Sequence, residues 1–370
     1  MNRKRFRCSF LSVLIFCSML LSLTGCQMQE KAMSVSWFDT DGSLIDQGYT
    51  EKDYDPANKE LPADTELWHY TGWTVSKSGN LIVCTATRVS KTRVEWYDHD
   101  GKLLKETYFT EEDEEPTFEL PSNNEKWTYV NWSSKKSRNA ITYTAERKPN
   151  ASYFQGNVFQ IVVWDQKGEP VGTGSGFVIN RDGWFITNDH VMREGFSATA
   201  FFDIEDYSSG SRYTQLEVLG GAYNSEDKDI FIGKLENYQK IRDHYREIEF
   251  TTTYAVGETC YSVGYPNSSV KVAINQGTIT EEYSDIHDKI NGIYYVLSDC
   301  YIAPGSSGGI LVNEKFEVIG ITSIGLYADT DKDVYVSGGS IPTFVFQSRL
   351  ASLSTSQLKT LSEIYDGGSL

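Results

Sequence analysis

Short runs in which apolar and polar residues alternate dominate residues 35–345 of this chain. Val35–Phe38 and Val94–Tyr97 alternate in this way, and each is followed by an Asp-Gly pair and a second apolar run. Alternation with a period of two is the pattern of a half-buried β-strand, and Asp-Gly between two such runs is a strong signal for a hairpin. The pattern therefore predicts a mostly β protein.

The first part of the chain is a tandem repeat. Trp37, Trp68 and Trp73 each recur 59 residues further on, in the same register and without a gap. A repeat of this length indicates one small structural unit that is present twice, over residues 35–89 and 94–148. Since the core of so short a unit is small, we interpret its tryptophans as core residues rather than sugar-stacking ones.

The repeated pattern consists of aromatic-D-x-D-G-x-L-L, then L-P, then W-x-Y-x-x-W and T-A-x-R. It resembles the β-grasp-like repeats of bacterial surface proteins, the Listeria–Bacteroides type. The resemblance implies two small β-grasp-like modules that follow a linker at residues 26–34. The residues identify no ligand, so a binding role and a role as simple spacers both stay open.

The N-terminus has the features of an export signal. Four basic residues among the first seven precede an apolar stretch from about Cys8 to Leu23, shorter than the roughly 20 apolar residues that span a bilayer. Leu23-Thr24-Gly25-Cys26 resembles the lipobox of bacterial lipoproteins. The resemblance implies a signal peptide over residues 1–25 and lipidation of Cys26, and two or more acyl chains hold a protein stably at a membrane. A plainly secreted protein is the alternative.

Composition limits the partners and cofactors. The formal net charge of −17 argues against nucleic acid or anionic lipid headgroups as partners. The five histidines are scattered without Cys or Glu at ligand spacing, so we expect no metal and no cofactor. Beyond the N-terminal segment the cysteines are Cys84, Cys260 and Cys300, an odd number that implies no full disulfide framework. Cys260 and Cys300 can pair in an oxidising compartment or remain buried free thiols.

A histidine, an aspartate and a serine, which together can form a catalytic triad, lie next to apolar runs in the second half of the chain. His190 follows one run, Asp229 precedes another, and Ser307 lies in a Gly-Ser-Ser-Gly-Gly turn that begins at Gly305. Alone, such a histidine is typical of a packed core and such a turn of a flexible loop. The order His, Asp, Ser is one of the known orders of a charge-relay triad.

The chemistry of such a triad requires these residue types. A serine hydroxyl is a weak nucleophile until an imidazole takes its proton, and the carboxylate holds the imidazole in the correct tautomer. The backbone N–H groups of Gly305 and Ser307 are then placed to hold the oxyanion. We therefore expect His190 as the general base, Asp229 as its orienting partner and Ser307 as the nucleophile.

Longer motifs surround these residues: G-T-G-S-G-F-V-I, T-N-D-H-V, D-I-x-I-x-K-L and P-G-S-S-G-G-x-L-V-N. Over residues 155–347 they closely resemble the trypsin-like serine peptidases of the bacterial Deg/HtrA type. The resemblance implies two six-stranded antiparallel β-barrels, of chymotrypsin type, with the site between them, and the same three catalytic roles. It does not extend to a PDZ domain, because residues 348–370 leave room only for one or two short helices, expected at Ser356–Tyr365.

The chain also departs from the family pattern. Ala303, Ser306 and Ile310 differ from the residues usual at their positions, which leaves the resting geometry of the Gly305 turn open. Phe231 and Gly233 differ from the usual residues after the aspartate.

The resemblance also implies a primary substrate pocket. By motif alignment it is lined by Tyr301, Ile302, Ser323 and Ile324. None of these side chains is acidic, so we expect a preference for small or medium apolar residues rather than Lys or Arg.

Together these features predict an extracytoplasmic serine endopeptidase that is anchored to the bacterial cell membrane by lipid. It would cleave protein or peptide substrates through an acyl-enzyme. The alternative is a lipid-anchored binding or adhesion protein in which the repeats are the working part and the protease fold is inactive or regulatory. An esterase of another fold is disfavoured, because the Gly-x-Ser-x-Gly elbow with Ser before His is absent.

Overall fold

The computed structural model describes residues 33–365, except 52, 282–288, 291 and 329–330. The predicted signal peptide and Cys26 lie outside the described residues. The chain divides into two compact units, one made of Met1–Leu120 with Asn131–Glu146 and the other of Pro121–Val130 with Arg147–Leu370. In the part of the chain that is described, no helix is long and apolar enough to cross a membrane.

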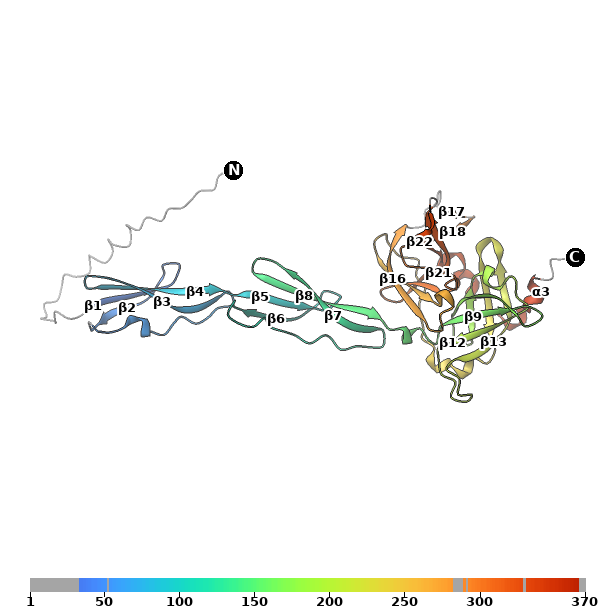
Figure 1. Ribbon diagram of the computed structural model, residues 1–370, viewed down its shortest axis with the longest axis horizontal. Helices are drawn as coiled ribbons and strands as arrows, with labels where there is room; N and C mark the ends of the chain where they lie inside the picture. Colours follow the sequence, from blue (N-terminus) through green and yellow to red (C-terminus); the bar gives the residue numbers. More distant parts are fainter. Residues whose placement is uncertain (1–32, 52, 282–288, 291, 329–330, 366–370) are drawn as a thin grey trace. The chain divides into compact units, whose positions relative to one another are not determined.

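Two four-stranded sheets of identical strand order occupy the region of the predicted repeats (Figure 1). In the first sheet the order is β2-β1-β4-β3, and the central strands β1 and β4 run parallel. In the second sheet the order is β6-β5-β8-β7, with β5 and β8 parallel. The strands are β1 (Met33–Phe38), β2 (Leu44–Thr50), β3 (Trp68–Ser78), β4 (Leu81–Ser90), β5 (Thr92–Tyr97), β6 (Leu103–Phe109), β7 (Trp127–Lys136) and β8 (Ala140–Pro149).

The tryptophans of these sheets are packed much as expected. Trp37 and Trp96, which are counterparts, are buried in the small cores of the first and second sheet. Trp96 stacks on Tyr143 with 5.6 Å between ring centroids. The prediction that the repeated tryptophans are core residues is confirmed for this pair, whereas Trp68 and Trp73 are only half-buried.

The boundary between the two units passes through the second predicted repeat. Residues 121–130 group with the unit that holds the barrels. The reason is Trp127, which is 5 % exposed and packs against Phe316 of that unit with ring centroids 4.7 Å apart.

The second unit contains two closed six-stranded barrels, which confirms the predicted mostly β, chymotrypsin-type fold. Their orders are β10-β11-β14-β13-β12-β9 and β15-β16-β19-β22-β21-β20. The first barrel has β9 (Val158–Trp164), β10 (Pro170–Val178), β11 (Trp184–Thr187), β12 (Ser197–Phe202), β13 (Thr214–Ser225) and β14 (Ile230–Leu235). The second has β15 (Thr259–Gly264), β16 (Ala273–Glu281), β19 (Val296–Ser298), β20 (Ile310–Asn313), β21 (Val318–Ala328) and β22 (Asp331–Pro342).

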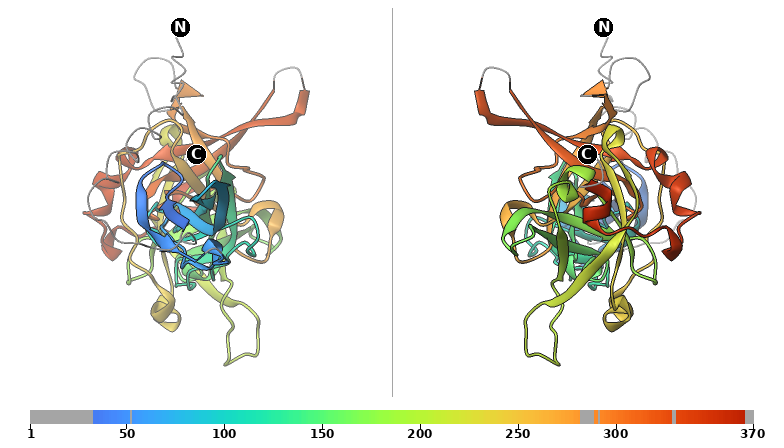
Figure 2. Two further views of the ribbon diagram at one scale, coloured as in Figure 1. Left: turned by 90° about the vertical axis from the view of Figure 1, so that its left-hand side faces the viewer. Right: turned by 90° about the vertical axis from the view of Figure 1, so that its right-hand side faces the viewer.

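Strands β21 and β22 continue beyond the second barrel as a long hairpin, drawn in orange-red in Figure 2. A separate short pair, β17 (Lys289–Ile290) and β18 (Ile293–Tyr294), is antiparallel.

A shared hydrophobic core fixes the two barrels against each other. Phe177, Ile186 and Ile230 of the first barrel belong to one buried cluster with Tyr261 and Val312 of the second. Burying apolar area at about 25 cal/mol per Å² makes such a cluster a large stabilising contribution. Side chains contributed by different barrels are therefore held in a fixed relation.

Three short helices complete the described structure of this unit: α1 (Asp189–Met192), α2 (Gln347–Leu350) and α3 (Leu361–Tyr365). The expected helix at Ser356–Tyr365 is shorter than predicted. Lys359 pairs with Gly221 as an isolated β-bridge, and this extended backbone separates the 3-10 turn Thr355–Gln357 from α3.

Candidate active site

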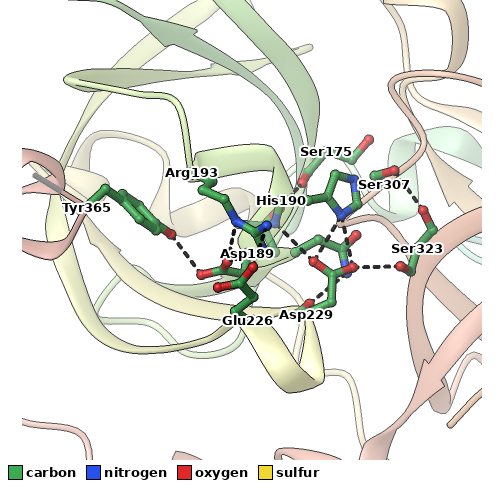
Figure 3. A network of polar contacts seen from close by, with 11 residues as sticks. Ser175, Asp189, His190, Arg193, Glu226, Asp229, Ser307, Ser323 and Tyr365 are labelled. Atoms are coloured by element: carbon green, nitrogen blue, oxygen red, sulfur yellow. Dashed lines mark hydrogen bonds and ion pairs between the residues drawn. The ribbon is translucent and has the colours of Figure 1, made fainter. Parts of the chain in front are cut away.

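Adjacent strands of the first barrel bring His190 and Asp229 together. His190 lies in α1 directly after β11, Asp229 directly precedes β14, and β11 pairs with β14. The imidazole Nδ1 lies 2.9 Å from both carboxylate oxygens of Asp229, and the His190 backbone N–H donates to Asp229 Oδ1 at 3.0 Å (Figure 3). The carboxylate therefore orients both the ring and the backbone of the histidine.

Asp229 is itself held from several directions. It is 5 % exposed, and its backbone is left-handed, with φ 51°. Asn and Asp tolerate this conformation better than other side chains with a Cβ, although it stores strain of about 1–3 kcal/mol. Ser323 Oγ donates to Asp229 Oδ2 at 2.7 Å, and Asn188 Nδ2 donates to its carbonyl at 3.1 Å. Ser323 thus holds the carboxylate so that it faces His190, and Asn188 holds the backbone of Asp229.

Ser307 comes from the second barrel, on the turn that precedes β20. Figure 3 shows the edge of the imidazole opposite Asp229 directed toward the Ser307 side chain. The Ser307 hydroxyl donates to the carbonyl of Ser323 at 2.9 Å. The single proton of this hydroxyl is therefore directed at Ser323 rather than at the imidazole.

The turn after the serine depends on a glycine. Gly308 has φ 85°, and a Cβ at this position would lie 2.0 Å from the carbonyl oxygen of Ser175 and 2.1 Å from Thr187 Oγ1. The Ser175 backbone N–H in turn donates to the Ser307 carbonyl at 2.7 Å. The turn that carries Ser307 thus lies directly against β10 of the first barrel and leaves no space for a side chain at position 308.

The two peptide groups that flank Gly305 each accept a hydrogen bond at the carbonyl oxygen. The Pro304 carbonyl accepts from Asn267 N at 2.6 Å, and the Gly305 carbonyl accepts from Ser175 Oγ at 2.7 Å. In a trans peptide the N–H points away from the carbonyl, so the Gly305 N–H is directed opposite to Asn267. Ser306 closes the turn by donating its N–H to the Ala303 carbonyl at 2.9 Å.

The four residues expected to line the substrate pocket differ in how far they are exposed to solvent. Tyr301 is 48 % exposed, whereas Ile302 is buried and lies so close to Gly338 that a Cβ there would meet Ile302 Cδ1 at 2.2 Å. Ile324 is half-buried on β21, beside Gly339. Ser323 is 3 % exposed, and its hydroxyl is engaged by Asp229.

Cys260 and Cys300 face each other in the second barrel. Their Sγ atoms lie 3.6 Å apart, both side chains are fully buried, and both are free thiols. The hydrogen bond with Cys300 and burial raise the pKa of Cys260 above its ordinary value. Across the described part of the chain, no group of three or more His, Cys, Asp or Glu side chains is arranged to hold a metal ion.

Sequence reasoning missed several residues that support the site. Ser175 stands in the G-T-G-S-G-F motif, which was the available signal for it. Asn267 and Tyr365 carried no signal, because each reaches the site only through a contact that is distant in the chain.

Part of this chain is similar to known proteins. Residues 174–321 match the family model of the trypsin-like peptidase domain. The chain is similar to a probable periplasmic serine endoprotease DegP-like of Hahella chejuensis (27 % identical over 157 residues, 42 % of this chain and 30 % of that protein). It is also similar to the putative serine protease HhoB of Synechocystis sp. (31 % over 159 residues, 41 % and 34 %) and to serine protease HTRA3 of Homo sapiens (27 % over 165 residues, 42 % and 34 %).

Solved structures that are similar to this chain include the HtrA-type protease AlgW with tripeptide, with TM-score 0.44, 18 % identity and coverage of 57 % of this chain and 65 % of that one. The serine endoprotease from Yersinia pestis has TM-score 0.42, 19 % identity and coverage of 56 % and 67 %.

The chain thus contains a trypsin-like serine protease domain. Its relatives in sequence are serine endoproteases of the HtrA and DegP type. The chain spans about a third of the length of these curated relatives.

Proposed function

We propose that this protein is an extracytoplasmic serine endopeptidase that hydrolyses peptide bonds of protein or peptide substrates through an acyl-enzyme. The observation that carries the proposal is the hydrogen bond between His190 and Asp229, joined by the Ser323 hydrogen bond to the barrel that carries Ser307. Neither barrel holds this constellation alone.

The geometry supports a definite division of roles. Because Nδ1 of His190 faces Asp229, Nε2 is the nitrogen that takes the proton from Ser307 Oγ as the oxygen attacks the substrate carbonyl carbon. His190 then returns the proton to the leaving amine as the C–N bond breaks. Water attacks the resulting ester by the same route and releases the acid, which restores Ser307.

We infer that the oxyanion site is formed before substrate binds. The hydrogen bonds from Asn267 N to the Pro304 carbonyl and from Ser175 Oγ to the Gly305 carbonyl support this. The first bond fixes the peptide that carries the Gly305 N–H, and the second fixes the next peptide, which lies between the N–H groups of Gly305 and Ser307. We expect these two N–H groups to hold the oxyanion, a contribution usually among the largest in acyl transfer. The changes at Ala303 and Ser306 are then compatible with an active turn.

Cleavage specificity follows from the proposed pocket residues. Tyr301, Ile302, Ser323 and Ile324 present no acidic group, and Ile302 is apolar and buried. We expect cleavage after small or medium apolar residues. A peptide library in which cleavage after Lys or Arg dominates would refute this.

The N-terminal part supports a tethered enzyme. We propose lipidation of Cys26 after removal of residues 1–25, and two β-grasp-like modules over 35–89 and 94–148 that act as spacers. Two sheets of the same order, each with a central parallel pair, support the modular reading. Mass spectrometry of the mature N-terminus, compared with Cys26→Ala, tests the anchor: an unmodified Cys26 in the wild type would disprove it.

A fluorophosphonate probe tests the proposed activity. We expect the probe to label the wild-type protein on Ser307, and Ser307→Ala to abolish both labelling and proteolysis. An unlabelled wild-type protein, with binding retained by residues 27–150 alone, would instead support the binding-protein alternative.

A further inference from the structure

The C-terminal segment, which follows the second barrel in sequence, returns to the first barrel. Lys359 and Gly221 exchange two backbone hydrogen bonds of 2.9 Å each, and α3 lies beside this barrel in Figure 1. Leu361 is 3 % exposed within the barrel's hydrophobic cluster. The segment is therefore part of the folded unit.

The first barrel is shaped to receive this segment. A Cβ on Gly220 would lie 2.2 Å from the Lys359 carbonyl oxygen, and one on Gly221 would lie 2.8 Å from Ile364 Cδ1. Glycine at both positions of β13 thus allows the tail to approach the strand closely. The contact between β13 and the C-terminal segment therefore depends on these two glycines.

Tyr365 at the end of this segment bonds a buried carboxylate. Its hydroxyl donates to Asp189 Oδ1 at 2.9 Å, and Asp189 is 1 % exposed (Figure 3). Arg193 holds the other oxygen, Oδ2, with Nε at 3.1 Å and Nη2 at 2.9 Å. The remaining contact to Oδ1 is a long one of 3.5 Å from Asn224 Nδ2. Tyr365 is therefore the main donor that fixes the orientation of Oδ1.

Asp189 adjoins the catalytic histidine. It is the first residue of α1, His190 is the second, and the backbone N–H of His190 donates to Asp229. The peptide that joins Asp189 to His190 is thus held at both ends. Its N–H donates to the Asp229 carboxylate, and the side chain of Asp189 is bonded to Arg193 and Tyr365. A turn of the Asp189 side chain toward Arg193 would shift this peptide and move the imidazole relative to Asp229.

The chemistry of Tyr365 suits a permanent donor. Burial, and next the charge of Asp189, raise the pKa of Tyr365 above its ordinary value. The hydroxyl accordingly keeps its proton to a higher pH than an ordinary tyrosine does. The second charged partner of Arg193, Glu226 at 3.0 Å, contacts only the guanidinium.

We propose that Tyr365 is a positioning residue for the general base: through Asp189 it fixes α1 so that His190 faces Ser307. The proposal rests on the peptidase function proposed above. Tyr365 touches no reacting atom, and its effect is confined to the geometry of the histidine.

The test compares Tyr365→Phe with Tyr245→Phe in the full chain. Tyr245 is a matched control, because its hydroxyl also donates one hydrogen bond within this unit, to the Ile179 carbonyl at 3.2 Å. Saturation kinetics of fluorophosphonate labelling separate probe affinity from the rate of bond formation. We expect Tyr365→Phe to lower the limiting rate about tenfold, since small misplacements of catalytic groups are costly, with affinity unchanged within about twofold. Tyr245→Phe changes neither quantity.

A second measurement does not require activity. Amide hydrogen exchange of residues 188–193 should accelerate about fivefold in Tyr365→Phe and not in Tyr245→Phe. If the wild-type protein is not labelled, the proposed peptidase function fails, while the exchange result still decides the role of Tyr365. Equal behaviour of the two variants in exchange, or in labelling where the wild type is labelled, overturns the inference.

An Asp189→Asn background tests the route of the effect. The amide keeps an oxygen that accepts from Tyr365 but removes the charge that binds it strongly. In this background Tyr365→Phe should lower the limiting rate by a smaller factor than in the wild type, with a logarithm less than about half as large. An undiminished effect would show that Tyr365 does not act through Asp189, and would overturn the proposal.

Discussion

Ser175→Ala provides the sharpest test of how the nucleophile turn is held. The Ser175 hydroxyl is fully buried and makes two hydrogen bonds, donating to the Gly305 carbonyl at 2.7 Å and accepting from the Tyr265 N–H at 2.9 Å. It thereby links β10 of the first barrel to the oxyanion turn and to the residue after β15 of the second. Alanine removes both bonds and changes little else.

The expected magnitude follows from the two groups that lose their partner. A buried peptide group without a hydrogen bond costs about 1–3 kcal/mol, so two such groups predict a loss of about 2–6 kcal/mol in the free energy of unfolding. The Gly305 peptide can relieve part of this cost by rotating toward another donor. This peptide carries the Ser306 N–H and lies between the two proposed oxyanion donors, the N–H groups of Gly305 and Ser307, so its rotation would displace one of them. Removing one such donor lowers the catalytic rate by about 10²–10³-fold.

Chemical denaturation and the limiting rate of fluorophosphonate labelling measure the two effects separately. Thr343→Val is the control, because the Thr343 hydroxyl is equally buried and donates to the Thr251 carbonyl at the same 2.7 Å, away from the turn. We expect both variants to lose stability and only Ser175→Ala to lose labelling rate. If Ser175→Ala is labelled as fast as Thr343→Val, Ser175 does not hold the turn and the reasoning is refuted.

Three further predictions follow from single contacts. Ser323→Ala removes the 2.7 Å donor to Asp229 and should lower the labelling rate about tenfold through the general base; an unchanged rate would count against this role. Gly308→Ala places a Cβ 2.0 Å from the Ser175 carbonyl oxygen and should lower the free energy of unfolding by at least about 4 kcal/mol, measured by urea titration, whereas a small loss would mean that the turn relaxes. Cys260 and Cys300 are both fully buried, so a reagent in solution does not reach either sulfur, and the hydrogen bond with Cys300 and burial also raise the pKa of Cys260. Both thiols should resist iodoacetamide in the folded protein at about pH 8 and react in urea, and alkylation of the folded protein would contradict this.

The features that local patterns carry were predictable from the sequence. Alternating runs predicted the mostly β fold, and the resemblance to trypsin-like serine peptidases implied the two barrels; the strand order confirms both. The order of His190, Asp229 and Ser307 predicted a triad because each residue adjoins an apolar strand of its own.

The supporting contacts could not be predicted, because they join residues that are far apart in the chain. Tyr365 and Asp189 are separated by 176 positions, and Ser175 and Gly305 by 130. No periodicity specifies such a pair; it appears only when the barrels close. The same reason explains the short α3, since the bridge between Lys359 and Gly221 interrupts the helix that the local sequence favours.

The arrangement of the site also determines which contact is most sensitive to the barrel interface. His190 and Asp229 lie next to neighbouring paired strands of one barrel, so the hydrogen bond between them depends on local strand pairing. Ser307 reaches them from the other barrel, across the cluster that contains Ile186 and Tyr261. A change that loosens this cluster should therefore separate Ser307 from His190 before it separates His190 from Asp229. The Ser323 hydrogen bond opposes that separation, because it ties the second barrel directly to Asp229.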